Sequence, residues 1–269
     1  MLRRTLPALA ALASIVAFAP AAASAQGQIH PGGMTFTEGA QCTANFVFRD
    51  AGGTYIGQAA HCSGTGAATE TDGCDSASLP LGTQVEIDGA TQPGTLAYNS
   101  WLAMQAAGEG NAEACEYNDF ALVRIDPADV GRVDPTVPGF GGPTSVAPAP
   151  TNLGATIYSY GNSSLRGGVA ALRPKEGRVV QNQGNGWSRN VYTVTPGIPG
   201  DSGSGFLNAS GQAIGTLSTV TILPTAGSNG VGDLSRELAY ARAHGFAGLE
   251  LVAGTRPFNG DLAGAILGG

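Results

Sequence analysis

Glycine and proline interrupt this sequence so often that long regular elements are excluded from most of it. Together, 42 glycines and 16 prolines make up more than a fifth of the 269 residues, against about an eighth in an average protein. Glycine frees the backbone and proline removes a main-chain donor, so both favour turns. With 42% apolar residues and a formal charge of −7, the chain has enough apolar content to fold. We therefore predict short β-strands with many turns, and not a helical bundle.

The apolar runs between these turns have the lengths and residue types of β-strands. They occupy residues 44–48, 84–87, 120–125, 155–160, 191–194 and 213–220. The proline-rich stretch 131–154 has no periodicity and reads as a linker between two β-rich halves. One helix is predicted from Asp233, which can cap it, to His244, with Gly245 ending it. The residues alone thus indicate two small β-barrels or sandwiches and a C-terminal helix.

The first 25 residues have the features of a secretory signal peptide. Arg3 and Arg4 precede an uncharged stretch that ends in Ala23-Ser24-Ala25, the order of charged, apolar and cleavage regions that export requires. An uncleaved membrane anchor is the alternative, because the run is just long enough to span a bilayer. Pro20 and the small residues after it favour cleavage near Ala25, and so we expect a secreted protein without a membrane partner after cleavage.

Charge excludes one class of partner. Loss of both arginines changes the formal charge from −7 to −9, and no basic stripe interleaved with aromatic residues is present. Nucleic acid is therefore not an expected partner.

Export also determines the expected redox state of the cysteines. The chain has four, at Cys42, Cys62, Cys74 and Cys115, and outside the cytosol an even set favours two disulfides with three pairings open. Gaps of 20, 12 and 41 residues do not fit a structural zinc site. The acidic loop 70–75 lacks the ordered spacing of a calcium loop. We predict neither a metal site nor a cofactor.

Three short motifs carry side chains with catalytic chemistry. His61 adjoins Cys62, Asp119 opens the apolar run 120–125, and Ser202 lies in the glycine-rich turn 199–205. Each also has a structural interpretation: a core imidazole, a solvated turn acid, an ordinary β-turn. Their order along the chain, His then Asp then Ser, is that of one family of catalytic triads. An α/β-hydrolase would need Gly-x-Ser-x-Gly, and Ser204 stands where its second glycine would be.

With these motifs the chain resembles the secreted bacterial chymotrypsin-like (trypsin-fold) serine proteases. The matching segments are Cys42 with Ala59-Ala60-His61-Cys62, Asn118-Asp119-Phe120-Ala121-Leu122, and Gly200-Asp201-Ser202-Gly203. The resemblance implies an all-β fold of two packed antiparallel six-stranded β-barrels with a C-terminal α-helix. It also implies a disulfide between Cys42 and Cys62, which leaves Cys74 to pair with Cys115.

The resemblance further implies a function, that of a serine endopeptidase acting on polypeptide substrates through an acyl-enzyme. Ser202 would be the nucleophile, His61 the general base and Asp119 the residue that orients it. The main-chain N–H groups of Gly200 and Ser202 would form the oxyanion hole, and Ser218 would support Asp119. A monomer is the family expectation.

The expected substrate-binding residues are Pro196, at the base of the specificity pocket, with Ser218, Thr219 and Val220 along its wall. No acid stands near Pro196, so cleavage after basic residues is not expected, and Val220 would narrow the pocket toward small or medium apolar side chains. For Asp201, two partners are open: a new N-terminus near Ile29, or an internal arginine, for which Arg166 is the candidate.

Two other functions remain as alternatives: a non-catalytic secreted binding module on the same fold, and a serine esterase. The predicted organisation assigns residues 1–25 to the signal peptide, 26–130 to the N-terminal barrel carrying His61 and Asp119, 131–154 to the inter-barrel linker, 155–230 to the C-terminal barrel carrying Ser202, and 231–269 to the C-terminal helix and tail.

Overall fold

The structure is a computed structural model that describes residues 29–67, 70–221 and 227–268, without the side chains of residues 220 and 221. The predicted signal peptide, residues 1–25, lies outside the described residues. Among the helices that the model does describe, none combines the length and apolar character needed to cross a bilayer.

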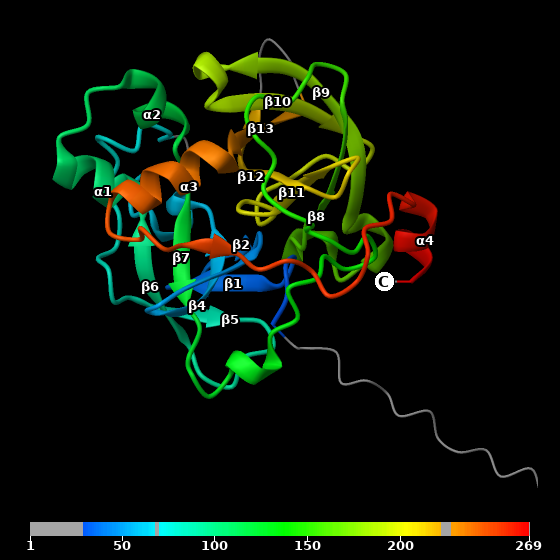
Figure 1. Ribbon diagram of the computed structural model, residues 1–269, viewed down its shortest axis with the longest axis horizontal. Helices are drawn as coiled ribbons and strands as arrows, with labels where there is room; N and C mark the ends of the chain where they lie inside the picture. The colour runs from blue at the N-terminus through cyan, green and yellow to red at the C-terminus, as the bar shows by residue number, and fades with distance from the viewer. Residues whose placement is uncertain (1–28, 68–69, 222–226, 269) are drawn as a thin grey trace, which may run out of the picture.

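The N-terminal unit is an antiparallel sheet of eight strands, most of it drawn in blue to green in Figure 1. Its spatial order is β14–β3–β4–β7–β6–β5–β1–β2. The strands are β1 (Met34–Thr37), β2 (Ala40–Thr43), β3 (Val47–Asp50), β4 (Gly53–Gln58), β5 (Gln84–Ile87), β6 (Gly94–Asn99), β7 (Ala121–Arg124) and β14 (Glu250–Leu251). In β5, Val85 and Ile87 are buried while Gln84 and Glu86 are exposed, as period-two alternation requires.

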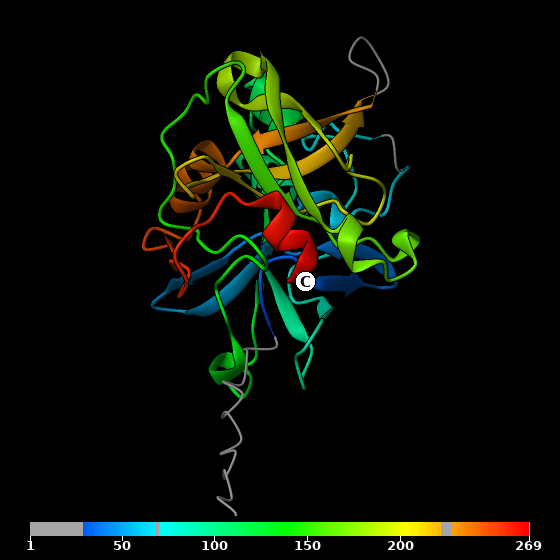
Figure 2. The same ribbon diagram turned by 90° about the vertical axis from the view of Figure 1, so that its right-hand side faces the viewer.

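The C-terminal unit is a closed antiparallel barrel of six strands in the order β10–β13–β12–β11–β8–β9. These are β8 (Thr156–Tyr160), β9 (Pro174–Gln183), β10 (Ser188–Thr193), β11 (Gly205–Asn208), β12 (Ala213–Thr221) and β13 (Ser228–Asp233). Figure 2, turned by 90°, shows this barrel packed above the N-terminal sheet.

The described helices are short: α1 (Ser100–Ala107), α2 (Ala112–Tyr117), α3 (Leu234–Ala243) and α4 (Leu262–Leu267). The predicted C-terminal helix is α3, whose first turn is capped by the Asp233 carboxylate through the Arg236 N–H. Asn99 caps α1 in the same way, a signal that the sequence carried in a stretch where we predicted no helix.

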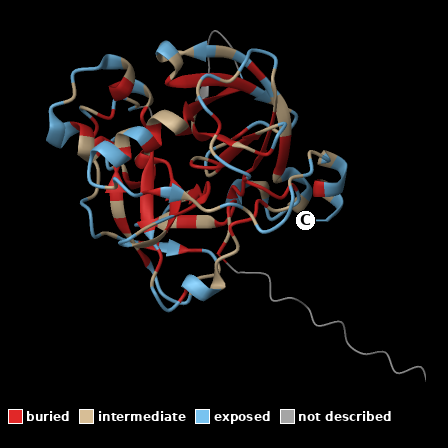
Figure 3. Cartoon of the chain, in the orientation of Figure 1, coloured by how far each residue is buried: buried red, intermediate tan, exposed pale blue. Residues whose placement is uncertain are grey.

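Among the described residues, the three largest apolar clusters are one inside each unit and one that joins them. The joining cluster contains Phe46 and Phe120 from the N-terminal unit, Leu207 from the closed barrel and Leu238 from α3. Figure 3 shows that buried residues line the facing sides of the two units, with exposed ones on loops and outer faces. This shared core holds the two units against each other.

The predicted all-β fold class, with two packed antiparallel units and a C-terminal helix, is confirmed. The closed barrel has six strands, whereas the N-terminal sheet has eight. The hairpin of β1 and β2 turns at Glu38 and Gly39, where φ is +46° and +86°, and joins the sheet through β5. The tail adds β14 beside β3.

The disulfide that the resemblance implies is present, and so is the pair that it leaves. Cys42 in β2 is bonded to Cys62, and Cys74 is bonded to Cys115 in α2. The second bond ties α2, which leads directly to Asp119, to the preceding loop.

Candidate active site

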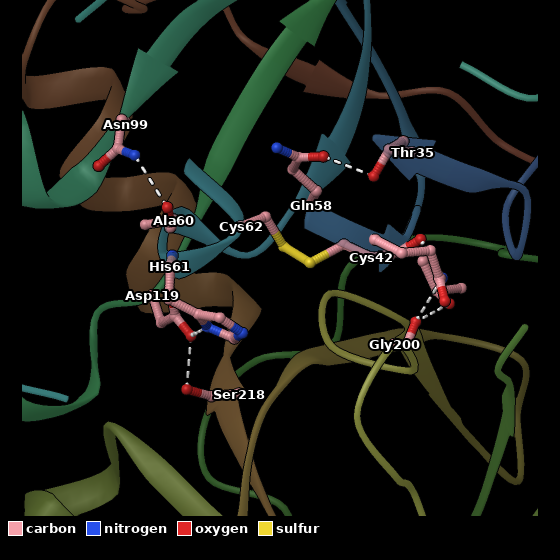
Figure 4. The surroundings of a disulfide bond; sticks show 12 residues. Thr35, Cys42, Gln58, Ala60, His61, Cys62, Asn99, Asp119, Gly200 and Ser218 are labelled. Atoms are coloured by element: carbon pink, nitrogen blue, oxygen red, sulfur yellow. Dashed lines mark hydrogen bonds and ion pairs between the residues drawn. A yellow bond between two sulfur atoms is a disulfide. The ribbon is translucent and has the colours of Figure 1, made fainter. Parts of the chain in front are cut away.

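His61 lies in a short 3-10 helix, Ala60–Ser63, directly after β4. The next residue, Cys62, is bonded to Cys42 in β2, and Asn99 Nδ2 donates to the Ala60 carbonyl at 3.0 Å. These bonds fix the main chain on both sides of His61, while the His61 side chain remains 28% exposed. The imidazole therefore has a fixed position and stays partly exposed; Figure 4 shows it beside Asp119.

Asp119, which is 3% exposed, holds His61 at two points. Its Oδ1 accepts the His61 main-chain N–H at 2.9 Å, and its Oδ2 accepts His61 Nδ1 at 2.6 Å. The Ser218 hydroxyl from β12 donates to the same Oδ2 at 2.5 Å (Figure 4). Because a carboxylate only accepts, Nδ1 must carry hydrogen, and Nε2 of neutral His61 is left as an acceptor.

The contact between His61 and Asp119 shifts the pKa values of both groups. Burial alone would lower the pKa of His61, but the charge of Asp119 and its hydrogen bond outweigh burial and raise that pKa above the usual value. Burial would raise the pKa of Asp119, but the charge and hydrogen bonds of His61, together with Ser218, hold it below the usual value. Asp119 thus stays ionised and favours a protonated His61.

Ser202 lies in a turn that approaches β2 very closely. Thr43 N–H donates to the Ser202 carbonyl at 2.8 Å, and Thr43 Oγ1 donates to the Gly200 carbonyl at 2.8 Å. A Cβ at Gly203, where φ is +89°, would come within 2.5 Å of the Thr43 carbonyl oxygen. Only glycine permits both this backbone conformation and this approach, which brings the Ser202 turn beside the His61 segment.

The turn also presents main-chain donors. Within the described residues, neither the Gly200 N–H nor the Ser202 N–H donates a hydrogen bond, and both residues line the cleft. The Ser202 hydroxyl likewise makes no hydrogen bond in the described part of the chain, to His61 or otherwise.

Asp201, next to Ser202, is fully buried and bound by two cations. Arg166 lies 2.6 Å from its Oδ2 and Lys175 Nζ lies 3.1 Å from the same oxygen, while the Ser163 N–H donates to Oδ1 at 3.0 Å. The internal arginine is thus the partner that the structure shows. The Ile29 N–H instead donates to the Arg132 carbonyl in the N-terminal unit, at 3.2 Å.

A cleft of about 560 Å³ runs between the two units and contains the predicted triad. Its lining includes residues of both units, among them His61, Asp119, Gly200, Ser202, Leu217, Ser218 and Thr219. Of the predicted pocket residues, Ser218 and Thr219 line the cleft, whereas Pro196 is exposed outside it, with its carbonyl accepting from Arg166. The side chain of Val220 lies outside the described residues.

Sequence reasoning missed two groups that hold the nucleophile turn. Lys175 is the single lysine of the chain and is fully buried against Asp201; that rarity was the one signal available. Gln41 and Thr43 of β2 both donate to the Gly200 carbonyl across the two units. No local motif marks them, because their role depends on how the two units pack.

No family model matches the sequence, and no curated protein matches it. Solved structures do match the fold. Protease A of Thermobifida fusca superposes with a TM-score of 0.55 at 20% identity, over 84% of this chain and 99% of that one. A glutamic-acid-specific serine protease gives 0.51 at 20% identity, over 83% and 100% of the two chains. A Glu endopeptidase gives 0.50 at 17% identity, over 82% and 92%. The chain therefore has the chymotrypsin-like fold of bacterial serine proteases.

Proposed function

We propose that this protein is a serine endopeptidase that uses Ser202, His61 and Asp119. The observation that carries the proposal is the set of three hydrogen bonds on the Asp119 carboxylate. These bonds fix the tautomer of the partly exposed His61 imidazole, which lines the same cleft as Ser202. A purely structural histidine would need neither a free Nε2 nor an unpaired serine beside it.

In the proposed reaction, Ser202 Oγ attacks the carbonyl carbon of a peptide bond and His61 Nε2 takes the hydroxyl proton. The main-chain N–H groups of Gly200 and Ser202 stabilise the oxyanion that forms, and one such donor lowers the barrier by about 3 kcal/mol. His61 then gives its proton to the leaving amine as the C–N bond breaks. Water hydrolyses the resulting acyl-enzyme by the same steps with His61 again as base.

The substrate is proposed to be a polypeptide without a basic residue before the cleaved bond. The two described segments that flank Ser202 in the cleft, residues 198–200 and 217–219, contain no carboxylate. A lysine or arginine side chain entering between them would therefore lose its hydration without gaining a partner.

We also propose that the protein acts outside the cell as a monomer. The two disulfides favour an oxidising compartment, and the sequence of residues 1–25 supplies an export signal that would be removed. In this proposal residues 26–130 and 155–230 are the two catalytic barrels, 131–154 the linker between them and 231–269 the helix and tail.

A fluorophosphonate probe tests the proposed function. We expect covalent labelling of the folded wild type and none of Ser202→Ala, because the probe reacts only with an activated serine. Ser204→Ala is the matched control, since Ser204 lies two residues away, is fully buried, and its hydroxyl has no hydrogen-bond partner among the described residues. That variant should label like wild type.

The outcomes separate the alternatives. Absence of labelling on folded wild type would favour a non-catalytic binding module. If labelling succeeds, turnover of casein supports the endopeptidase, whereas hydrolysis of short acyl esters without casein cleavage would support the esterase.

A further inference from the structure

The Asn229 side chain joins Gly197, the residue before the cleft segment 198–200, to Thr219 in the cleft segment 217–219. Asn229 lies in β13 and is 1% exposed. Its Oδ1 accepts the Gly197 N–H at 2.7 Å, and its Nδ2 donates to the carbonyls of Gly197 at 3.2 Å and Thr219 at 3.4 Å. One amide thereby connects the segment before the nucleophile turn with the strand that carries Ser218.

Gly197 shows what fills the space between these segments. A Cβ built on Gly197 would lie 2.6 Å from Leu217 Cδ1 and 2.8 Å from Asn229 Nδ2. Leu217 and Asn229 thus occupy the volume into which a side chain at position 197 would point. Leu217 and Thr219 line the cleft, and Asn229 lies against the Gly197 and Thr219 main chain behind them.

The polar atoms of the Asn229 amide already have main-chain hydrogen-bond partners. Both hydrogens of Nδ2 have main-chain acceptors and Oδ1 has a main-chain donor. Asn229 is neutral, so it offers no charge to an entering side chain and no spare donor. It therefore acts through the volume that it fills.

We propose that Asn229, together with Leu217, closes the bottom of the pocket beside Ser202 and restricts it to small, uncharged side chains such as alanine. The proposal rests on the serine endopeptidase function proposed above and names its substrate class. Narrowing by Val220 was expected from the sequence, whereas this restriction comes from a buried amide that the sequence analysis did not assign.

The test uses p-nitroanilide peptides that differ only in the residue before the cleaved bond: alanine, leucine, phenylalanine or arginine. We expect wild type to turn over the alanine peptide faster than the phenylalanine peptide, by about tenfold or more in kcat/KM. Asn229→Ala should shift that ratio toward leucine and phenylalanine by about 10- to 200-fold, the range that one methylene in an apolar pocket commands. Because each ratio compares two substrates on one enzyme sample, partial loss of folded protein cancels.

Asn208→Ala is the matched control. The Asn208 amide also bonds the main chain, accepting the N–H groups of Ser210 and Gln212 in the turn after β11. Within the described residues, the hydrogen bonds of this amide stay in that turn and do not involve Gly197 or Thr219. Its substrate ratios should equal those of wild type.

Three results would overturn the proposal. Wild type that prefers phenylalanine or arginine overturns it without any variant, and so does an unchanged ratio in Asn229→Ala that still labels with fluorophosphonate. Wild type that fails to label at all overturns the proposed function and the pocket with it, which distinguishes that failure from the other two.

Discussion

Asp119 determines which nitrogen of His61 can accept a proton, and it also sets how strongly the proton is held. With Nδ1 bonded to the carboxylate at 2.6 Å, only Nε2 of the neutral ring is left to accept a proton. The main-chain bond at 2.9 Å fixes the backbone of the same residue. Geometry and basicity therefore depend on one buried carboxylate.

This dependence predicts an acid limb in the pH profile. A general base must be neutral, so kcat/KM should rise with pH through the pKa of His61. Because that pKa is raised, the midpoint should lie above about 6.5, the ordinary histidine value. The measurement is kcat/KM of a peptide substrate from pH 5 to 9.

Asp119→Asn supplies the complementary variant. In the serine protease on which the effect is established, the same change leaves the geometry intact but selects the wrong tautomer and lowers kcat by about 10⁴. We expect a loss of similar order here. Ser218→Ala, which removes only one of the three hydrogen bonds, should lose far less. For the pH prediction above, a wild-type kcat/KM that does not change between pH 5 and 9 would contradict the assigned role of His61.

Lys175 carries a second residue-scale prediction, about stability. Burial lowers its pKa to about 8, partly offset by the charge of Asp201, whereas in the unfolded chain it is near 10.5. Between these values the unfolded chain binds a proton that the folded chain does not. Raising the pH from 8 to 10 should therefore increase the contribution of Lys175 to the free energy of unfolding by roughly 2 kcal/mol.

Lys175→Met isolates this contribution, because the chain has no other lysine to titrate in that window, and Asp201 keeps Arg166 as its partner. Urea denaturation of both proteins at pH 7, 8, 9 and 10 gives the difference. It should grow with pH in favour of wild type above pH 8. A difference independent of pH would mean that burial does not lower the pKa of Lys175 in the folded protein.

At the scale of elements, the sequence was informative where local chemistry decides the structure. Helix α3 has its cap at Asp233 and a buried stripe at Leu234, Leu238 and Ala241, and we predicted its extent nearly to the residue. Strand β5 alternates over 84–87 and was likewise predicted with its observed bounds. Both patterns are readable because one face of each element is buried.

Strand β9 (Pro174–Gln183) was not predicted, because most of its length reads as polar. Its barrel position buries Lys175 at one end, where Asp201 compensates the charge, and leaves other side chains at the surface. A lysine inside a strand contradicts the usual apolar pattern and is tolerated only through a distant carboxylate.

The candidate site divides in the same way. His61, Asp119 and Ser202 stand in short motifs whose order along the chain is informative, and the structure brings them to one cleft. Thr43, Lys175 and Asn229 carry no motif. Their contacts join residues at sequence separations of 157, 26 and 32, for example Thr43 to Gly200, and so they follow from strand register, which local patterns do not specify.

At the scale of the whole molecule, the site exists only where the two units meet. His61 and Asp119 belong to the N-terminal unit and Ser202 to the closed barrel. Hydrogen bonds cross between the units from Thr43 to Ser202 and from Ser164 to Gln41, at 2.8 and 3.0 Å. A separation of the units would therefore dismantle the site even while both sheets remained folded.

The two tryptophans allow a measurement of whether the two units separate before they unfold. Trp101 in α1 and Trp187 before β10 lie in one buried cluster with Ala60, the residue before His61, so tryptophan fluorescence reports on the junction of the units. Because the apolar core that contains Phe46, Phe120, Leu207 and Leu238 also spans both units, we expect the units to unfold together. In a urea titration, fluorescence, far-ultraviolet circular dichroism and fluorophosphonate labelling should share one midpoint, with Ser202→Ala as the labelling blank. Labelling lost at lower urea than circular dichroism, with fluorescence following the labelling, would show instead that the units separate first, and the shared core would then be weaker than its burial indicates.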